Sequence, residues 1–464
     1  MIYRNSIFLL CLFLCQQSLA QESNHSNDVA YLREAKKIKE AALTERNAYA
    51  MLRELTQTIG SRLSGSPQAA AAVEWGRQTM QKYGLENVHL QEVLVPHWVR
   101  GSVEEAAVLN SPTVGTRPLT VCALGGSVGT PELGLVGEVL EVQDFEQVQA
   151  LGSKAKGKII FYNRPMDPTV STFRAYVGAV DQRTRGAVEA ARIGALAALV
   201  RSMTTRLDDV PHTGAMRYEE GVPKIPAAAV STVDANLLSA LIKRDGVVRV
   251  RLRLSCQTLP DVPSANVVGE ITGSEKPDEV ILLGGHLDSW DKGQGAHDDG
   301  AGCVQAIEAL RLLKALGLRP KRTVRAVLFM NEENGSRGGR KYAEVVKKDG
   351  PKHIAAIESD AGGFAPRGFS VRSKNDKAIN QVARWAYLLQ DINAGTIKPG
   401  FGGSDVAPLE KLGVTTIGLN VDSNRYFDYH HSDNDTFDKV NERELELGAA
   451  AMAILAYVLA MEGV

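Results

Sequence analysis

Apolar positions at helical spacing dominate the first part of the chain. Residues 29–57 and 67–83 repeat apolar side chains every three or four positions, which predicts two helices. Residues 88–95 have the composition and alternation of a strand. We therefore expect residues 21–113 to form the amino-terminal part of a larger domain.

Short β-rich runs replace this pattern between residues 114 and 259. Five segments predict strands, and two segments between them predict helices. The predicted strands are residues 135–142, 158–162, 196–200, 225–230 and 247–254, and the predicted helices are residues 186–193 and 233–243. This stretch predicts a small α/β module, residues 114–259, inserted between two segments of the larger domain.

Strands and helices alternate after Pro260-Asp261-Val262-Pro263, which we interpret as a domain boundary. The predicted strands are residues 280–284, 324–330, 353–359 and 415–420. Residues 300–316 carry an apolar helical face, and residues 445–459 predict a terminal helix with an apolar run too short to span a bilayer. Residues 260–464 therefore predict an α/β fold with a doubly wound, mostly parallel sheet.

Composition narrows the class of protein without naming a partner. A chain of 464 residues with 44% hydrophobic content can bury a large core and divide into more than one domain. The net charge of -1 comes from 53 basic and 54 acidic residues without a long block of one sign. This balance argues against a nucleic-acid surface and against a basic membrane-binding helix.

The first twenty residues differ from the rest. Arg4 supplies a positive charge, residues 7–15 form an apolar core, and Ser18-Leu19-Ala20 is a small-x-small cleavage site. A membrane anchor needs roughly 20 apolar residues, and a lipoprotein site needs a small residue where Leu14 precedes Cys15. We expect a cleaved signal peptide at residues 1–20 and a secreted or periplasmic protein without a membrane span.

Cysteines are few once that peptide is removed. Cys122, Cys256 and Cys303 remain, an odd and sparse set that predicts no disulfide framework. A bridge between Cys122 and Cys256 is one alternative, and three buried thiols are the other. None of the three has the spacing of a zinc knuckle.

Acidic residues and histidines that could bind a metal follow the predicted strands of the last segment. They are His286, Asp288, Asp298, Glu332, Glu333, Asp360 and His431. Open α/β sheets bind ligands beyond the carboxyl ends of their strands, so these side chains should converge on one edge. Each alone has a plainer explanation: Asp298 and Asp299 could cap the following helix, the glutamate pair could be a solvated turn, and His430-His431 could be an ordinary loop. The combination is more specific than its parts.

Five of these residues can serve two zinc ions if one carboxylate bridges. We assign Asp298 as the bridge, His286 and Asp360 to one ion, and Glu333 and His431 to the other. Each ion then has three protein ligands and keeps a position for water. Cobalt or manganese could replace zinc at such nitrogen and oxygen ligands.

The chain resembles the co-catalytic zinc exopeptidases, the family of aminopeptidase Y and glutamate carboxypeptidase II. The motifs that carry the resemblance are Gly285-His286-Leu287-Asp288-Ser289-Trp290-Asp291, Asp298-Asp299-Gly300, Asn331-Glu332-Glu333, Ser359-Asp360-Ala361-Gly362 and His431-Ser432-Asp433-Asn434-Asp435-Thr436. The resemblance implies the same five ligands for two zinc ions, with Glu332 as general base. It also implies that the Asp288 carboxylate accepts the free ring N–H of His286, and that the bond between Asp298 and Asp299 is cis.

The same resemblance implies that residues 260–464 are the catalytic domain and that residues 114–259 are a protease-associated domain. A related zinc-exopeptidase family has a similar ligand order but places a dimerisation domain between its last two ligands. The segment from Asp360 to His431 is too short for such a domain. Relatives dimerise, so a homodimer is an expectation, although no feature of the sequence marks its interface.

We therefore expect an exported metallo-exopeptidase that hydrolyses dipeptides or terminal residues of short peptides. A catalytically inactive binding ectodomain and a glutaminyl cyclase-like transferase on the same fold are the alternatives. The side-chain preference stays open. The turn Gly402-Gly403-Ser404-Asp405 could contact a substrate terminus or be only a turn, and Tyr429 could donate to an oxyanion or only pack.

Overall fold

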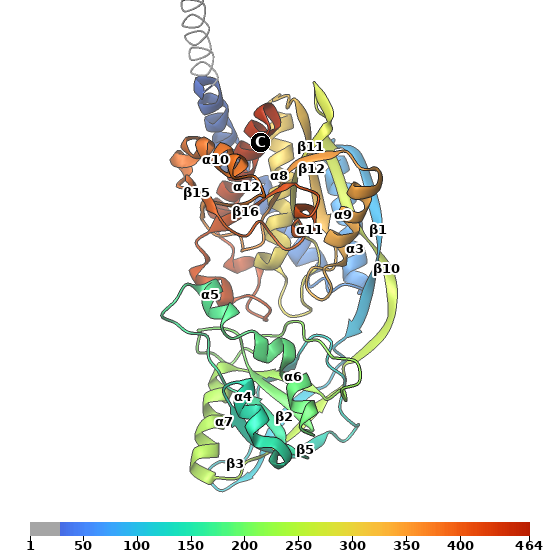
Figure 1. Cartoon of the computed structure of the whole chain (residues 1–464), viewed down its shortest axis with the longest axis vertical. Coiled ribbons are helices and arrows are strands. Elements are labelled where there is room, and N and C mark those ends of the chain that lie inside the picture. The colour runs from blue at the N-terminus through green and yellow to red at the C-terminus, as the bar shows by residue number, and fades with distance from the viewer. Residues whose placement is uncertain (1–27) are drawn as a thin grey trace, which may run out of the picture.

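The computed structural model describes residues 28–464, so the predicted signal peptide lies outside the described residues. Two eight-stranded sheets form two units, one above the other in Figure 1. The first unit combines the amino-terminal and carboxyl-terminal parts of the chain. The second unit is made from the segment between them, as the interrupted pattern of the sequence predicts.

The first sheet has the strand order β1-β10-β12-β11-β13-β16-β14-β15. Its strands are β1 (Glu86–Val99), β10 (Gln257–Ile271), β11 (Lys276–His286), β12 (Arg322–Phe329), β13 (Lys352–Glu358), β14 (Pro366–Arg372), β15 (Thr396–Pro399) and β16 (Thr415–Val421). The four neighbours β12, β11, β13 and β16 are parallel and are the four strands that the apolar runs predict. Antiparallel pairs join β1, β10 and β14 to this centre, so the sheet is mixed but mostly parallel.

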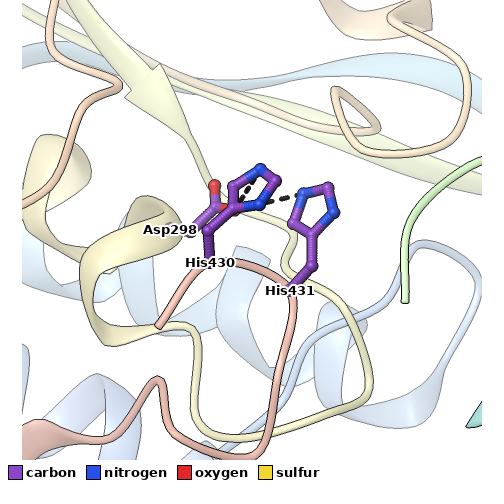
Figure 2. A group of neighbouring side chains, drawn as sticks. All are labelled: Asp298, His430 and His431. Atoms are coloured by element: carbon purple, nitrogen blue, oxygen red, sulfur yellow. Dashed lines mark ion pairs between the residues drawn. The ribbon is translucent and has the colours of Figure 1, made fainter. Parts of the chain in front are cut away.

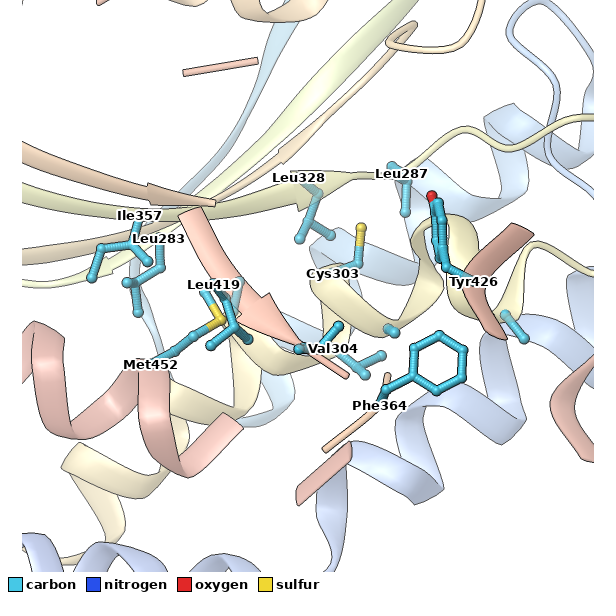
Figure 3. Packing of buried hydrophobic residues seen from close by; sticks show 14 of the residues in the cluster. Leu283, Leu287, Cys303, Val304, Leu328, Ile357, Phe364, Leu419, Tyr426 and Met452 are labelled. Atoms are coloured by element: carbon cyan, nitrogen blue, oxygen red, sulfur yellow. The ribbon is translucent and has the colours of Figure 1, made fainter. Parts of the chain in front are cut away.

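Helices cover both faces of the first sheet. Ile281 and Leu283 of β11 pack with α3 (Pro67–Lys82), α8 (Ala301–Ala315) and α12 (Glu442–Glu462). Leu282 points the other way and packs with α9 (Arg337–Asp349) and α11 (Ala407–Glu410). A central strand buried on both faces requires the continuous apolar run that this segment shows. Figure 3 shows Leu283 and Ile357 of the sheet beside Met452 of α12.

The length of α12 differs from the prediction. It spans 21 residues with a mean hydropathy of 1.7, so it is long and apolar enough to cross a bilayer by length and composition. The expectation of too short a run is therefore wrong. However, 78% of its apolar window is buried inside the protein, against α8 and the sheet. Its apolar character on all sides is that of a core helix.

The predicted amino-terminal helix is interrupted. Residues 28–45 are helical, and then α2 (Asn47–Glu54) and a π-helical turn, η1 (Leu55–Ile59), follow. The break lies at Arg46, whose φ of 55° is left-handed. The next helix, α3, begins where the sequence predicts, because Pro67 stands at its first position and the Ser66 hydroxyl accepts the Ala69 N–H at 3.0 Å.

The second sheet has the strand order β3-β2-β9-β5-β6-β7-β8-β4. Its strands are β2 (Glu104–Ser111), β3 (Gly115–Leu119), β4 (Val121–Ala123), β5 (Leu135–Val142), β6 (Ile159–Tyr162), β7 (Ala197–Arg201), β8 (Ala227–Val230) and β9 (Arg249–Leu254). The helices α4 (Phe145–Leu151), α5 (Thr172–Val177), α6 (Asp181–Arg192) and α7 (Thr232–Asp245) accompany it. Since β2 pairs with β9, this unit begins before the expected boundary at residue 114.

A long antiparallel ribbon of β1 and β10 runs between the two units (Figure 1). Pro260 and Pro263 lie inside β10, so the expected boundary there is wrong. The ribbon tolerates proline because β10 pairs with β12 only from Val267 onward. Before that residue one edge of β10 is open, and proline's missing N–H breaks no ladder there.

Cys122, Cys256 and Cys303 are free and buried. The alternative of a bridge between Cys122 and Cys256 is therefore wrong. Cys122 lies in β4, and burial raises the pKa of its thiol to about 12. These side chains act as small apolar residues.

Candidate metal centre

The carboxyl ends of the central strands bring the predicted ligands to one edge of the first sheet. His286 is the last residue of β11, Glu332 and Glu333 follow β12, and Asp360 follows β13. Asp298 lies in the π-helical turn η3 (Ala296–Gly300) before α8. The fifth ligand, His431, lies on the loop after the 3-10 helix η5 (Ser423–Asp428), with a left-handed φ of 60°. Figure 2 shows Asp298 with His430 and His431.

Asp298 lies between the two predicted metal-binding histidines. Its Oδ1 is 3.1 Å from His286 Nε2, and its Oδ2 is 3.3 Å from His431 Nε2. Asp360 Oδ1 is 3.5 Å from His286 Nε2, and Glu333 Oε2 is 2.9 Å from His431 Nε2. The structure thus brings the five residues together in two groups that share one carboxylate.

These donors suit divalent cations. Glu333 Oε1 is buried without a hydrogen-bond partner among the described residues, and Asp298 Oδ2 has no hydrogen bond there beyond its ion pair with His431. A buried carboxylate oxygen without a partner is costly, and a cation would satisfy it. Imidazole nitrogens with carboxylate oxygens are the ligand set of catalytic zinc sites. The cluster therefore fits a metal centre.

The protonation of the cluster supports the same conclusion. Burial raises the pKa of Glu332 to about 8 and that of Glu333 to about 7. Burial also opposes a charge on His431, but Glu333 and Asp298 raise its pKa to about 9. Crowded carboxylates and histidines hold extra protons in this way when only protons balance the negative charge, and metal binding releases such protons.

The ring of His286 is oriented by a main-chain atom. Its Nδ1 donates to the carbonyl oxygen of Asp288 at 2.9 Å, while the nearest carboxylate oxygen of Asp288 is 3.9 Å away. The expectation that the Asp288 carboxylate accepts this N–H is therefore wrong. That carboxylate instead accepts the backbone N–H groups of Asn331 at 2.6 Å and Glu332 at 3.0 Å, and the Ser64 hydroxyl at 3.0 Å. Asp288 thus holds the turn that carries Glu332.

Two other aspartates position Asp298 and His286 through the main chain. Asp435 accepts the N–H groups of His297 at 2.7 Å and Asp298 at 3.1 Å. Asp299 accepts the His286 N–H at 3.0 Å and also accepts the Gly302 N–H, in the first turn of α8, at 2.9 Å. The peptide bond between Asp298 and Asp299 is cis, as the resemblance implies. Sequence reasoning did not single out Asp435, although it lies in the motif that begins at His431.

The structure shows the surroundings of the two segments near the site whose roles the sequence left open. Glu358 accepts the backbone N–H groups of Ser404, Asp405 and Val406, so residues 402–405 form a turn fixed beneath the site, from which Ser404 reaches the cavity. Tyr429 is 1% exposed, stacks on His297 with ring centroids 5.1 Å apart, and is bonded to Arg425. It therefore packs and does not line the cavity.

A cavity of about 970 Å³ opens over the cluster. His286, Glu332 and His431 line it from the first unit, and Tyr176 and Arg183 line it from the second. Its size suits a short peptide rather than a folded protein. The second unit therefore covers the metal centre.

Comparison with known proteins gives one consistent result. The family model "Peptidase family M28" matches residues 266–458. Carboxypeptidase Q of Mus musculus is 41% identical over 416 residues, which cover 90% of this chain and 86% of that protein. The crystal structure of a peptidase M28 precursor from Shewanella amazonensis has a TM-score of 0.90 at 38% identity, and the match covers 94% of this chain and 98% of that one.

A more distant structure extends the similarity of fold. A zinc aminopeptidase from Bacillus subtilis has a TM-score of 0.64 at 19% identity, over 89% of this chain and 94% of that one. At this identity the match concerns the α/β fold alone.

Proposed function

This chain belongs to peptidase family M28, and from that premise we propose that it is an exported exopeptidase that uses two zinc ions to hydrolyse dipeptides and terminal residues of short peptides. The family is the one that the motifs of the sequence predict. It is a carboxypeptidase Q-like metallopeptidase with histidine, aspartate and glutamate groups that can hold metal. The number of ions, the role of each residue and the substrate are the proposal.

The position of Asp298 is the observation that carries the two-ion proposal. Each of its carboxylate oxygens faces a different histidine, at 3.1 and 3.3 Å. His286 and Asp360 would hold one ion with it, and Glu333 and His431 would hold the other. When bound, two zinc ions supply polarisation of the scissile carbonyl and acidification of a water molecule.

Glu332 is the general base of this proposal. It lines the cavity next to the ligand Glu333, and the Asp288 carboxylate fixes its main chain. Burial raises the pKa of Glu332 to about 8, close to neutral pH. In its ionised form, which metal binding to the cluster would favour, the Glu332 carboxylate can take a proton from the attacking water and return it to the leaving amine.

The alternatives require changes that this chain does not carry. A non-catalytic ectodomain would be expected to lose ligands, whereas the five predicted ligands and Glu332 are all of competent residue types. Nothing in the site favours a transferase over hydrolysis. We therefore retain peptide hydrolysis as the proposed function.

Export and the nature of the second unit complete the proposal. We infer that residues 1–20 are removed during secretion or transfer to the periplasm. We infer also that the second unit is a protease-associated domain, supported by its place in the chain and by its residues that line the cavity over the candidate metal centre. Amino-terminal sequencing of protein recovered outside the cytoplasm would test the first inference, with Gln21 as the expected first residue. A homodimer stays an expectation, to be tested by sedimentation.

Hydrolysis of a dipeptide by the purified mature protein tests the central proposal. Activity should disappear when the metal is removed and return with zinc, and metal analysis should give two ions per chain. Glu332→Gln should keep both ions and lose turnover by on the order of 100-fold or more. Glu344→Gln is the control, because this exposed glutamate on α9 undergoes the same change of charge away from the site. Wild-type protein that binds two ions but cleaves no peptide would contradict the proposal.

A further inference from the structure

A second cavity lies in the second unit, apart from the metal centre. It has a volume of about 470 Å³, and none of the described residues that line it also lines the cavity over the metal centre. Its wall includes Glu141 near the end of β5, Asn163 directly after β6 and Arg201 at the end of β7. These strands are parallel neighbours, so their carboxyl ends meet at one edge of the sheet. Such an edge is where open α/β sheets bind ligands.

The helix α7 forms another wall of this cavity. Asn236, Ser239 and Lys243 line it from positions three and four residues apart, which lie on one face of a helix. The Ser239 hydroxyl lies 2.9 Å from each carboxylate oxygen of Glu141. Asn163 and Ser239 are only 9% and 7% exposed. The cavity therefore has polar groups that are fixed by the fold.

The side chain of Asn163 separates two opposite charges of the wall. Its Nδ2 donates to Glu141 Oε1 at 2.6 Å, and its Oδ1 accepts from Arg201 Nη1 at 3.2 Å. No ion pair among the described residues includes Glu141 or Arg201. A carboxylate and a guanidinium therefore line the same cavity, one amide group apart, without neutralising each other directly.

The guanidinium of Arg201 has donors left over. Its hydrogen bonds to Asn163 and Asn236, at 3.2 and 2.8 Å, both come from Nη1. Its Nε is buried and has no partner among the described residues. In this chain Arg311 uses Nε and Nη2 together to bind the Glu308 carboxylate with two hydrogen bonds, the bidentate geometry that arginine favours. The same edge of Arg201 lacks an anion.

Glu141 can accept a further donor. Its Oε1 accepts from Asn163 and is also close to Ser239 and Gln143, whereas its Oε2 has only the Ser239 hydroxyl. A carboxylate oxygen has two lone pairs, so Oε2 has room for an N–H group. A simple anion would satisfy Arg201 but would lie against the negative charge of Glu141. A ligand with both charges would satisfy the two groups at once.

We propose that this cavity binds a free α-amino acid, with its carboxylate on Arg201 and its ammonium group on Glu141. An α-amino acid carries its two charged groups on one carbon atom, a separation that suits charges held one amide group apart. Pro165 and Ala240 also line the cavity and offer apolar contact to a side chain. The volume lies within the range of roughly 300 to 1,000 Å³ for small-molecule sites. The inference depends on this cavity alone and not on the chemistry at the metal centre.

Calorimetric titration of the zinc-loaded protein with L-alanine tests this proposal. L-alanine amide lacks the carboxylate, and N-acetyl-L-alanine lacks the ammonium group. Each should bind more weakly than L-alanine by on the order of 10-fold or more, because one charge-assisted contact is lost. Arg201→Gln should weaken binding of L-alanine by on the order of 10- to 100-fold for the same reason. Ala240→Trp should also abolish binding, because this exposed position on α7 can take an indole that fills the cavity without a change of charge.

Arg244→Gln is the matched control. Arg244 is an exposed arginine of α7 that does not line the cavity, so the variant should bind L-alanine as the wild type does. Zinc content and thermal unfolding of every variant are measured in parallel, and Ala240→Trp decides if Arg201→Gln does not fold. Unchanged binding in the cavity variants would place L-alanine at another site and overturn the proposal.

Two other results would also overturn it. Equal binding of L-alanine and N-acetyl-L-alanine would indicate a site for simple anions, and no binding to the wild type would leave the cavity without this ligand. Hydrolysis of dipeptides by the wild type is measured separately. The proposed peptidase function therefore stands or fails independently of this site.

Discussion

Asp288 acts on the site mainly through the main chain. Its position two residues after His286 suggested a carboxylate behind a histidine ligand, an arrangement common in zinc sites. In the structure the backbone carbonyl of Asp288 accepts the His286 ring N–H instead. The Asp288 carboxylate accepts the N–H groups of Asn331 and Glu332. Sequence spacing could place the residue at the site, but the choice between its two oxygen groups depends on the turn of the backbone after β11.

Substitution of Asp288 separates these two functions. Asp288→Ala should lower kcat by on the order of 100-fold, because two buried N–H groups lose their acceptor and the Glu332 turn loosens. Zinc content should be retained, since the backbone carbonyl still orients His286. Asp288→Asn keeps one acceptor oxygen and should lose less activity. Zinc loss in proportion to activity in the alanine variant would instead mean that the carboxylate positions His286.

A second buried carboxylate predicts a dependence of stability on pH. Glu446 of α12 accepts the Tyr49 N–H at 2.9 Å, and its Oε2 has no partner among the described residues. Burial raises its pKa from 4.5 to about 8, with Glu308 and Glu442 adding to the shift and Arg311 opposing it. The folded state thus holds a proton that the unfolded state releases at lower pH. Stability is therefore lost as pH rises from about 4.5 to about 8.

Glu446→Gln should remove that loss, because the amide keeps an acceptor for Tyr49 and carries no charge. Above pH 8 the variant should exceed the wild type in free energy of unfolding by up to about 5 kcal/mol, given about 1.4 kcal/mol for each pKa unit between 4.5 and about 8. Near pH 4 the two proteins should have equal stability. Urea unfolding of both proteins across this range provides the measurement. A difference that does not change with pH would rule out titration of Glu446 as the cause.

Residues 60–66, between η1 and α3, hold the loop that follows β11 in place. Arg62, which is fully buried, makes its hydrogen bonds there to main-chain carbonyl oxygens. Its guanidinium donates to Gly60, Leu287, Gln294 and Gly295 at 2.7 to 3.0 Å. The planar fork of arginine can reach several carbonyls at once. Residues 60–66 therefore connect the amino-terminal helices to the loop between His286 and Asp298.

Arg62→Lys keeps the positive charge but loses the planar guanidinium, whose several N–H groups donate in different directions. We expect the variant to lose about 3 kcal/mol of unfolding free energy, because lysine leaves buried carbonyl oxygens without donors. Metal affinity should also fall, because the loop that Arg62 holds connects the predicted ligands His286 and Asp298. Denaturant unfolding and zinc titration measure the two effects. Arg53→Lys, an exposed arginine of α2, should change neither, and equal stability of Arg62→Lys and wild type would contradict this role of Arg62.

The elements that sequence predicts well are those with their own apolar signal. β11, β12, β13 and β16 are short apolar runs buried on both faces, and the carboxyl ends of the first three carry the predicted ligands His286, Glu333 and Asp360. β2 and β15 lack such a signal, since their side chains are partly polar or exposed and they depend on pairing with distant strands. The partner of Arg62 and the acceptor for His286 depend likewise on tertiary contacts, which local spacing does not encode.

The two units meet on the loop that presents the predicted metal ligand His431. His212 Nδ1 donates to the His430 carbonyl at 2.7 Å, and the Thr213 N–H donates to the His431 carbonyl at 2.9 Å. Both carbonyls of the histidine pair are thus held by the second unit. His431 has a left-handed φ, a conformation that a residue with a side chain keeps only when its surroundings enforce it. The second unit therefore helps to build the centre that it covers.

Replacement of His212 tests this coupling across the whole molecule. Burial lowers the pKa of His212 to about 4, so it is a neutral donor at pH 7. His212→Leu removes the donor and should weaken binding of the ion at His431 by roughly 10- to 100-fold, the range for lost partners of metal ligands. The ion at His286 and Asp360 should bind as before, because neither of these residues lies on the loop that His212 holds. Zinc titration should then resolve one tight and one weakened ion, whereas His212→Asn, whose amide can still donate to His430, should keep two. Equal weakening of both ions in His212→Leu would point to general unfolding instead, and unchanged binding would mean that the first unit alone fixes His431.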